Sequence, residues 1–281
     1  MTAVPAPVPA PVSTPGHPAR FRDLLAAEWL KFRSLRSTCL LLALSALAVV
    51  AVSLKAATYT CANSSPGAPR SAVAQVALDD SFGTLAITLV MITAGSIGAL
   101  VMAGEFASGS IRGTLAAVPA RRSVLAAKAC VLAAAMSGYG ACCAGVSYGL
   151  AQAVLSGHRA AVGLDYPGAL RFVVAAALFA PVCALAGLGL GTLVRHPAGA
   201  VAATVLVLFL LPSLCSDRYA WSAALSHLMP LTALHRLLEL DPAHFAPSPH
   251  PASVGGAWLA FALWAAGGTA LGAALLHRRD V

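Results

Sequence analysis

Six stretches of the sequence are long, apolar and free of charged side chains except at one edge. They cover residues 38–55, 81–104, 129–157, 172–194, 197–216 and 252–276, and the first ends on Lys55, whose aliphatic stem can reach the interface. A bilayer core about 30 Å thick requires roughly 20 apolar residues in a helix. Because no stretch alternates as a membrane β-strand does, we expect helices, which satisfy their own backbone hydrogen bonds in lipid. The sequence therefore predicts an all-α membrane protein with six transmembrane helices.

The composition supports the same class. Hydrophobic residues make up 59% of the chain and charged residues 10%, whereas soluble domains have about 45–50% and about 25%. This excludes a water-soluble globular enzyme and the disordered and collagen-like classes. In a membrane protein the net charge of +8 reports topology before it reports a nucleic-acid partner, so no nucleic acid is expected.

The basic residues predict the orientation. With the N-terminus in the cytoplasm, twelve Lys and Arg fall in inner segments and six in outer ones. Lys and Arg collect on the cytoplasmic side of membrane proteins. Six crossings return His277-Arg278-Arg279 to the same side, so both termini are predicted to be cytoplasmic.

The chain divides into a tail and one domain. Residues 1–19 are rich in Pro and Ala and lack both a basic start and a continuous apolar core, so they predict a disordered tail and not a signal peptide. Residues 20–281 form the predicted six-span domain. Cys61 and Cys215 both fall near the outer face, and sequence alone leaves their pairing open.

A basic amphipathic helix is predicted before the first span, over Arg20–Ser37. Its apolar face holds Phe21, Leu24, Leu25, Phe32 and Leu35. Such a helix lies in the membrane interface, although a plain juxtamembrane anchor is an alternative. Glu28 projects into the apolar face, where an unpaired carboxylate is costly. It can pair with Lys31, three residues on, or with a basic residue of another helix.

The segment between spans two and three predicts a short helix parallel to the membrane. Gly109 can break the preceding helix, and Pro119 ends whatever follows it. This loop and the N-terminal helix are the main cytoplasmic surfaces, so a soluble partner should dock there. Glu105 and Arg112 are candidates for the polar contacts of that joint, with solvated interface charges as the alternative.

Several polar and small residues leave alternatives open. Residues 220–240 predict one or two short interfacial or re-entrant helices on the outer side, followed by a Pro- and His-rich loop over 241–251. The outer histidines fit no metal-ligand spacing, so solvated loop residues are preferred to a metal site. Gln152 can contact a substrate or, by preference, a neighbouring helix. Three GxxxG pairs favour packing within the chain over a dimer seam; they are Gly145/Gly149, Gly187/Gly191 and Gly268/Gly272.

No energy source is encoded in the chain. The sequence lacks the P-loop, H-E-x-x-H and G-x-S-x-G motifs. No carboxylate lies in the middle of a span, whereas ion-driven carriers usually need an ionisable group there. If the protein moves something uphill, the energy must come from another subunit.

Several motifs resemble those of a known family. They are Ala27–Ser34 (AEWLKFRS), Glu105–Leu115 (EFASGSIRGTL), Pro119–Arg122 (PARR) and Ala127–Lys128. They look like the permease subunit of ABC-2 type transporters in the actinobacterial style. The resemblance covers most of the chain from Arg20, and the Glu-x-x-x-Gly-[Ser/Thr]-Ile-Arg stretch is its most specific part. One mild departure is Ser110, where Thr is usual.

The resemblance implies a transport function and no catalytic activity in this chain. It implies a multi-pass permease of the bacterial cell membrane, an exporter that pairs with an ABC ATP-binding subunit and with a second permease copy, identical or different. The chain itself binds no cofactor or metal and has no catalytic residue, since ATP–Mg is bound by the partner. The implied coupling residues are Glu105, Gly109, Arg112 and Thr114, and the implied elbow-helix residues are Glu28, Trp29, Lys31 and Arg33. Substrate-binding residues stay unassigned.

Two other classes compete with this interpretation. A non-transporting membrane anchor or sensor could recruit a soluble partner through the same loop. An intramembrane enzyme is disfavoured because the spans lack carboxylates and Ser/His pairs.

Overall fold

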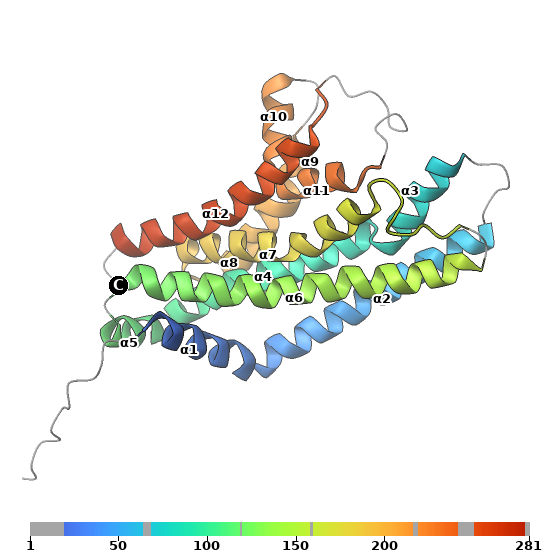
Figure 1. Ribbon diagram of the computed structural model, residues 1–281. Helices are drawn as coiled ribbons and strands as arrows, with labels where there is room; N and C mark the ends of the chain where they lie inside the picture. Colours follow the sequence, from blue (N-terminus) through green and yellow to red (C-terminus); the bar gives the residue numbers. More distant parts are fainter. Residues whose placement is uncertain are drawn as a thin grey trace, which may run out of the picture.

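The computed structural model describes residues 20–63, 69–118, 120–157, 160–215, 219–240 and 250–278, and every regular element in these ranges is a helix. The predicted tail 1–19, Pro119 and most of the predicted loop 241–251 lie outside the described residues. Figure 1 shows long helices running side by side, with short helices at the two ends of the bundle.

The helices follow one another along the chain without an intervening strand in the described ranges. Their bounds are α1 (Phe21–Ser34), α2 (Arg36–Asn63), α3 (Arg70–Ser81), α4 (Thr84–Ala107), α5 (Ser110–Ala117), α6 (Arg121–Ser156), α7 (Ala169–Val194), α8 (Pro197–Val205), the π-helical turn η1 (Leu206–Leu210), α9 (Leu211–Leu214), α10 (Ala220–Leu228), α11 (Pro230–Leu238) and α12 (Val254–Arg278).

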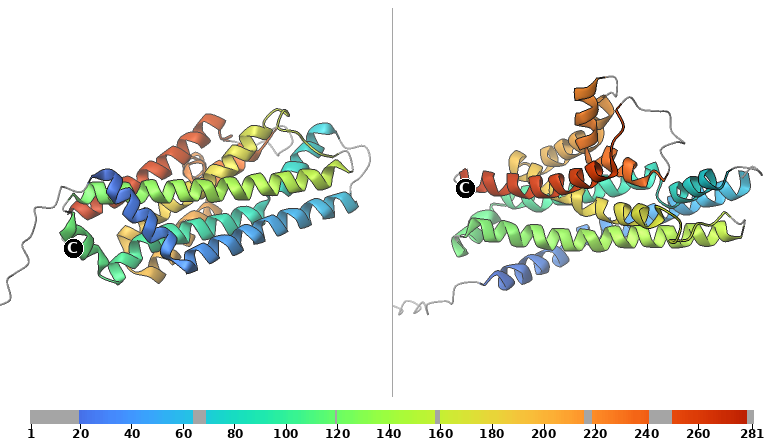
Figure 2. Two further views of the ribbon diagram at one scale, coloured as in Figure 1. Left: turned by 60° about the horizontal axis from the view of Figure 1, so that its bottom comes forward. Right: turned by 45° about the horizontal axis from the view of Figure 1, so that its top comes forward.

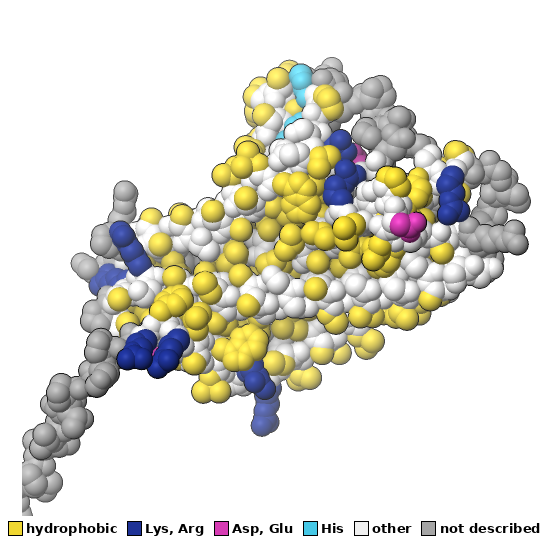
Figure 3. Space-filling view, in the orientation of Figure 1, with side chains coloured by type: hydrophobic (Ala, Val, Ile, Leu, Met, Phe, Trp, Pro, Cys, Tyr) yellow, Lys and Arg dark blue, Asp and Glu magenta, His cyan; other side chains and the backbone are white. Residues whose placement is uncertain are grey.

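Six helical segments are long and apolar enough to cross a membrane, which confirms the predicted fold class. They are α2, α3–α4, α6, α7, the continuous segment Pro197–Leu214 and α12. Each overlaps one predicted span, and α2 and α6 extend well beyond theirs. The space-filling view agrees, because hydrophobic side chains cover the middle of the visible face and charged ones gather toward its ends (Figure 3).

Helix α7 forms the centre of the bundle and packs against α4, α6 and α12. The approach to α4 depends on glycine, since a Cβ on Gly98 would overlap the backbone of Ala184, and one on Gly187 would overlap Gly95. Small residues allow such close helix contacts in membranes. Packing within the chain is therefore confirmed for Gly187/Gly191 and for Gly268/Gly272, but no described atom lies near a Cβ built on either Gly145 or Gly149.

Two short helices, α10 and α11, form within residues 220–240 as the sequence predicted. His227 and His235 lie on these helices, not in a loop, so that part of the prediction was wrong. Cys61 and Cys215 are not joined to each other in a disulfide, which settles the pairing that sequence left open.

The two ends of the described chain lie at the same end of the bundle (Figure 1; Figure 2). The Arg121 side chain, at the start of α6, donates a hydrogen bond of 3.0 Å to the carbonyl oxygen of Leu276 near the end of α12. Helices α1 and α5 lie at this end too, and we call it the α5 end. Its placement in the cytoplasm stays a prediction.

Candidate functional site

The amphipathic helix predicted before the first span is α1, and it carries a carboxylate toward the bundle. Helix α1 ends at Ser34, and the chain bends at Leu35 into α2 (Figure 2). Glu28 is the buried residue of α1, with 7% of its surface exposed. Because α1 packs mainly against α6, this carboxylate faces the start of α6.

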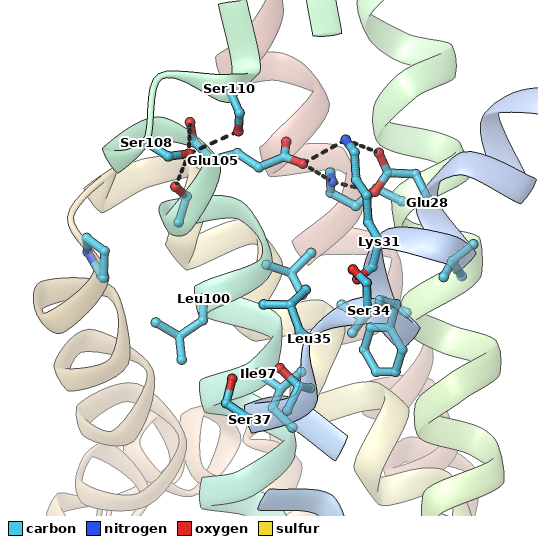
Figure 4. A pocket seen from close by; sticks show the side chains of 18 of the residues that line it. Glu28, Lys31, Ser34, Leu35, Ser37, Ile97, Leu100, Glu105, Ser108 and Ser110 are labelled. Carbon is cyan, nitrogen blue, oxygen red and sulfur yellow. Dashed lines mark hydrogen bonds and ion pairs between the residues drawn. The ribbon is translucent and has the colours of Figure 1, made fainter. Parts of the chain in front are cut away.

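Four charged side chains from three helices form one cluster, which we call the ion cluster: Glu28 and Lys31 of α1, Glu105 of α4 and Lys128 of α6. Lys128 Nζ lies 2.6 Å from Glu28 Oε2 and 2.8 Å from Glu105 Oε1. Lys31 Nζ lies 3.0 Å from Glu28 Oε1 and 3.2 Å from the same Glu105 oxygen. Figure 4 shows Glu28 and Lys31 from one helix converging with Glu105 from another.

Burial makes the two lysines unequal. The Lys128 side chain is 3% exposed, whereas that of Lys31 is 45% exposed. Burial lowers the pKa of Lys31, but its hydrogen bonds and ion pairs with Glu28 and Glu105 outweigh that effect and raise it overall. The Lys128 side chain is buried away from water, where a charged group is stable only when oppositely charged groups pair with it. The cluster is therefore electrically balanced, with Lys128 at its centre and Lys31 at its edge.

Helix α5 is the short helix expected between spans two and three. Gly109 precedes it with a φ of 71°, in the left-handed region that glycine adopts without strain. Ile111 is 2% exposed and anchors the helix, while Arg112 is exposed and makes no ion pair with any described residue. Thr114 donates its hydroxyl to the carbonyl oxygen of Ser110 at 3.2 Å, within the helix.

The ion cluster brackets α5. Glu105 lies in the last turn of α4, shortly before α5, and Lys128 lies in the second turn of α6, shortly after it. Their ion pair joins the two helices that lead into and out of α5. Through Glu28, the same cluster ties both to α1. A displacement of α5 therefore acts on a joint shared by three helices.

Deeper in the bundle, a neutral hydrogen-bond network links α4 and α6 through α2. The buried Ser45 hydroxyl of α2 lies 2.8 Å from that of Thr93 in α4 and 2.7 Å from that of Tyr139 in α6. Hydrogen bonds between membrane helices satisfy polar groups that lipid would leave unpaired. Thus α4 and α6 are cross-linked twice along their length, by ions at the end and by hydroxyls further in.

The structure brings together only part of the predicted site. Glu28, Lys31 and Glu105 join in the ion cluster, whereas Trp29, Arg33 and Arg112 are exposed outside it. Trp29 stacks on Phe32 with ring centroids 6.3 Å apart. Both partners anticipated for Glu28 are present at once, Lys31 on its own helix and a basic residue of another.

Sequence reasoning missed two basic residues at this end. Lys128 was named only as part of a family motif, because nothing in the sequence shows that it meets Glu28 across 100 positions. Arg195 ends α7 with a φ of 58°, and its guanidinium lies 4.7 Å from the ring centroid of Phe106, beside Glu105. The unpaired Glu28 on an apolar face was the available signal for Lys128.

Most of the chain matches a family of known proteins. Residues 24–212 match the family described as ABC-2 family transporter protein. No protein of curated function matches the sequence. The matched region contains α1, α5 and the ion cluster, and it extends through most of the fifth span. A match over more than half of the chain, together with six membrane-spanning helices, shows that this protein belongs to the ABC-2 transporter family and is a multi-pass permease of that class.

Proposed function

We propose that this permease is the membrane half of an exporter whose energy comes from a separate ATP-binding subunit. The observation that carries the proposal is the bracketing of α5 between Glu105 and Lys128. Helix α5 presents an exposed Arg112 at the bundle end and contacts α4, and residues of the ion cluster that joins α1, α4 and α6 flank it in the chain. ATP and Mg²⁺ belong to the partner, and this chain supplies no residue to hydrolysis.

The mechanism we propose is mechanical. The ATP-binding subunit holds α5 in two positions as it binds and hydrolyses ATP, and its differential contacts bias the permease between two states. The ion cluster transmits the displacement, because α4 and α6 cannot separate there without breaking a buried ion pair. Most transporters with these motifs are exporters, so we propose export as the direction.

A second permease copy is part of the proposal. Only 17% of an apolar 18-residue stretch of α2 and 22% of the residues of Pro197–Leu214 are buried within the chain. Leu40, Leu44 and Leu47 leave more than half of their surface exposed along one side of α2. These faces suit lipid and a second permease, identical or different, in a bacterial cell membrane.

Co-purification with the full chain tests the identity of the partner. We expect the full chain, solubilised from its native membrane, to co-purify with an ATP-binding subunit whose hydrolysis rate changes when the two are reconstituted together. Arg112→Ala should lower that change at least about tenfold, as loss of a charged contact of about 1.5–3 kcal/mol implies. Arg122→Ala removes an equally exposed arginine of the same bundle end and should leave it intact.

Two results would contradict the proposal. One is a permease that accumulates a solute in vesicles without any ATP-hydrolysing subunit. The other is a stable complex with a soluble partner that hydrolyses no ATP, which would favour the anchor or sensor that competes with transport.

A further inference from the structure

A cavity opens beside the ion cluster, between α1, α2, α4 and α6. Its volume is about 590 Å³, which is within the range of about 300–1,000 Å³ that ligand sites occupy. All four charged residues of the ion cluster line it. Figure 4 shows the charged groups at one end of the cavity, beside Ser108 and Ser110.

The rest of the cavity is apolar. Leu35 and Leu41 contribute from the α1–α2 side, and Ile97, Leu100 and Val101 contribute from α4. In Figure 4, Leu35, Ile97 and Leu100 lie further along the bundle than the charged groups. A ligand that fills this space must have a polar head at the α5 end and an apolar body directed toward the membrane interior.

The charged end has, within the described ranges, one acceptor oxygen without a hydrogen-bond partner and one lysine with a spare N–H donor. Both lysines bond the same oxygen of Glu105, Oε1, and Oε2 is buried with no hydrogen-bond partner among the described residues. Lys31 carries three N–H donors and bonds two described acceptors, the oxygens of Glu28 and Glu105. A buried carboxylate oxygen without a donor is costly, so a cationic N–H donor at Glu105 would be favourable.

The lining charges also exclude ligands with a single charge. Two carboxylates and two ammonium groups sum to zero, so an anion meets Glu28 and Glu105 and a cation meets Lys31 and Lys128. A zwitterion satisfies both signs, with its phosphate at half-exposed Lys31 and its ammonium at Glu105. Lys31 stays protonated for this contact, since its pairs keep its pKa raised.

We infer that this cavity binds one zwitterionic phospholipid with a primary ammonium headgroup, of the phosphatidylethanolamine class. The headgroup contacts Lys31 and Glu105, and an acyl chain follows Leu35, Leu41 and Leu100 toward the bilayer centre. The lipid is taken from the leaflet at the α5 end. This inference does not depend on the ATP-binding partner or on transport.

Native mass spectrometry of the full chain in detergent tests the inference with three probes: dioleoyl phosphatidylethanolamine, phosphatidylcholine and phosphatidylglycerol. Phosphatidylcholine is the matched probe, because it is zwitterionic but has no N–H donor. We expect one phosphatidylethanolamine bound at least about tenfold more tightly than phosphatidylcholine, the effect of one charge-assisted hydrogen bond. Equal binding of these two, or tighter binding of phosphatidylglycerol, overturns the headgroup assignment.

Variants locate the site. Leu100→Trp fills the cavity and should weaken phosphatidylethanolamine binding at least tenfold, and Leu41→Trp does the same from α2 if the first variant folds poorly. Leu47→Trp changes an exposed leucine of α2 outside the cavity and should have no effect. Lys31→Met should weaken both zwitterionic lipids. Full binding in the cavity-filling variants places the lipid elsewhere and overturns the inference.

Discussion

The two ends of the bundle are held together by different chemistry. At the α5 end, charged side chains from three helices pair with one another in the ion cluster. At the opposite end, neutral and charged side chains bond mainly to backbone groups. Gln152 donates to Ala77 O and Ser81 Oγ at 3.1 Å and accepts from Val162 N at 2.8 Å.

Side chains also hold the C-terminal end of α11 by hydrogen bonds to its backbone. Gln75 of α3 accepts from the backbone N–H of Leu240 at 2.8 Å, and Arg171 of α7 donates to the carbonyl oxygens of Leu237 and Glu239. Side chains that satisfy backbone groups hold a loop in one conformation. An ion cluster confined to side chains can instead move as a unit with its helices. We therefore expect the α5 end to transmit displacement and the other end to resist it.

Removing Lys128 should have the largest effect. Lys128→Met leaves Glu28 and Glu105 buried with half of their charge compensation lost, and we expect the free energy of unfolding to fall by about 3–5 kcal/mol. Denaturant or thermal unfolding in detergent measures it. The control is Lys55→Met, at an exposed lysine of the same chain, which should change stability by less than about 0.5 kcal/mol.

A double variant tests whether Lys128 stabilises the protein through its ion pairs or through the packing of its side chain. Adding Glu28→Gln to Lys128→Met removes one of the two stranded charges, so the double variant should regain about 1–3 kcal/mol over the single one. Strictly additive losses would show that the four charges do not act as a cluster.

Removing Gln152 should have an intermediate effect. Gln152→Leu strands the buried backbone N–H of Val162, at about 1–3 kcal/mol for a buried group left unsatisfied. Hydrogen exchange should rise around Val162 and not around α5. A matched change, Ser156→Ala near the same end of α6, removes an exposed hydroxyl and should leave exchange unchanged. Faster exchange at both ends would break the comparison.

Removing Lys31 should have the smallest effect, because its side chain is 45% exposed and exposed pairs contribute about 0–1 kcal/mol. Its raised pKa means that the folded state holds the proton more tightly than the unfolded one. This stabilisation is complete below the ordinary value of 10.5 and is lost as pH rises through the folded-state pKa. The stability difference between wild type and Lys31→Met should therefore stay constant from pH 6 to 9; a clear pH dependence there would contradict it.

Sequence predicted the parts of this protein that depend on local pattern. The six spans follow from apolar length, α5 follows from Gly109 at its start, and the role of Gln152 in bonding a neighbouring helix is confirmed. It also predicted that Glu28 needs a cation, since a lone carboxylate on an apolar face is costly.

Sequence could not predict which distant residues meet. Lys128 pairs with Glu28 because α1 crosses α6, and composition contains no information on that crossing. The GxxxG pairs show the same limit, since Gly187 packs on α4 whereas Gly145 faces no described atom. The same GxxxG motif packs against another helix in one case and not in the other, because its packing depends on where its helix lies in the bundle.

The central claim is that a separate ATP-binding subunit acts on this permease through α5. Ala116→Cys, at an exposed position of α5, in a chain whose native cysteines are replaced, can be labelled with a membrane-impermeant maleimide in vesicles of both orientations. The account predicts labelling only from the cytoplasmic face, and protection of Cys at this position when the ATP-binding subunit is bound. Labelling from the outside, or labelling that the bound subunit leaves unchanged, would contradict it.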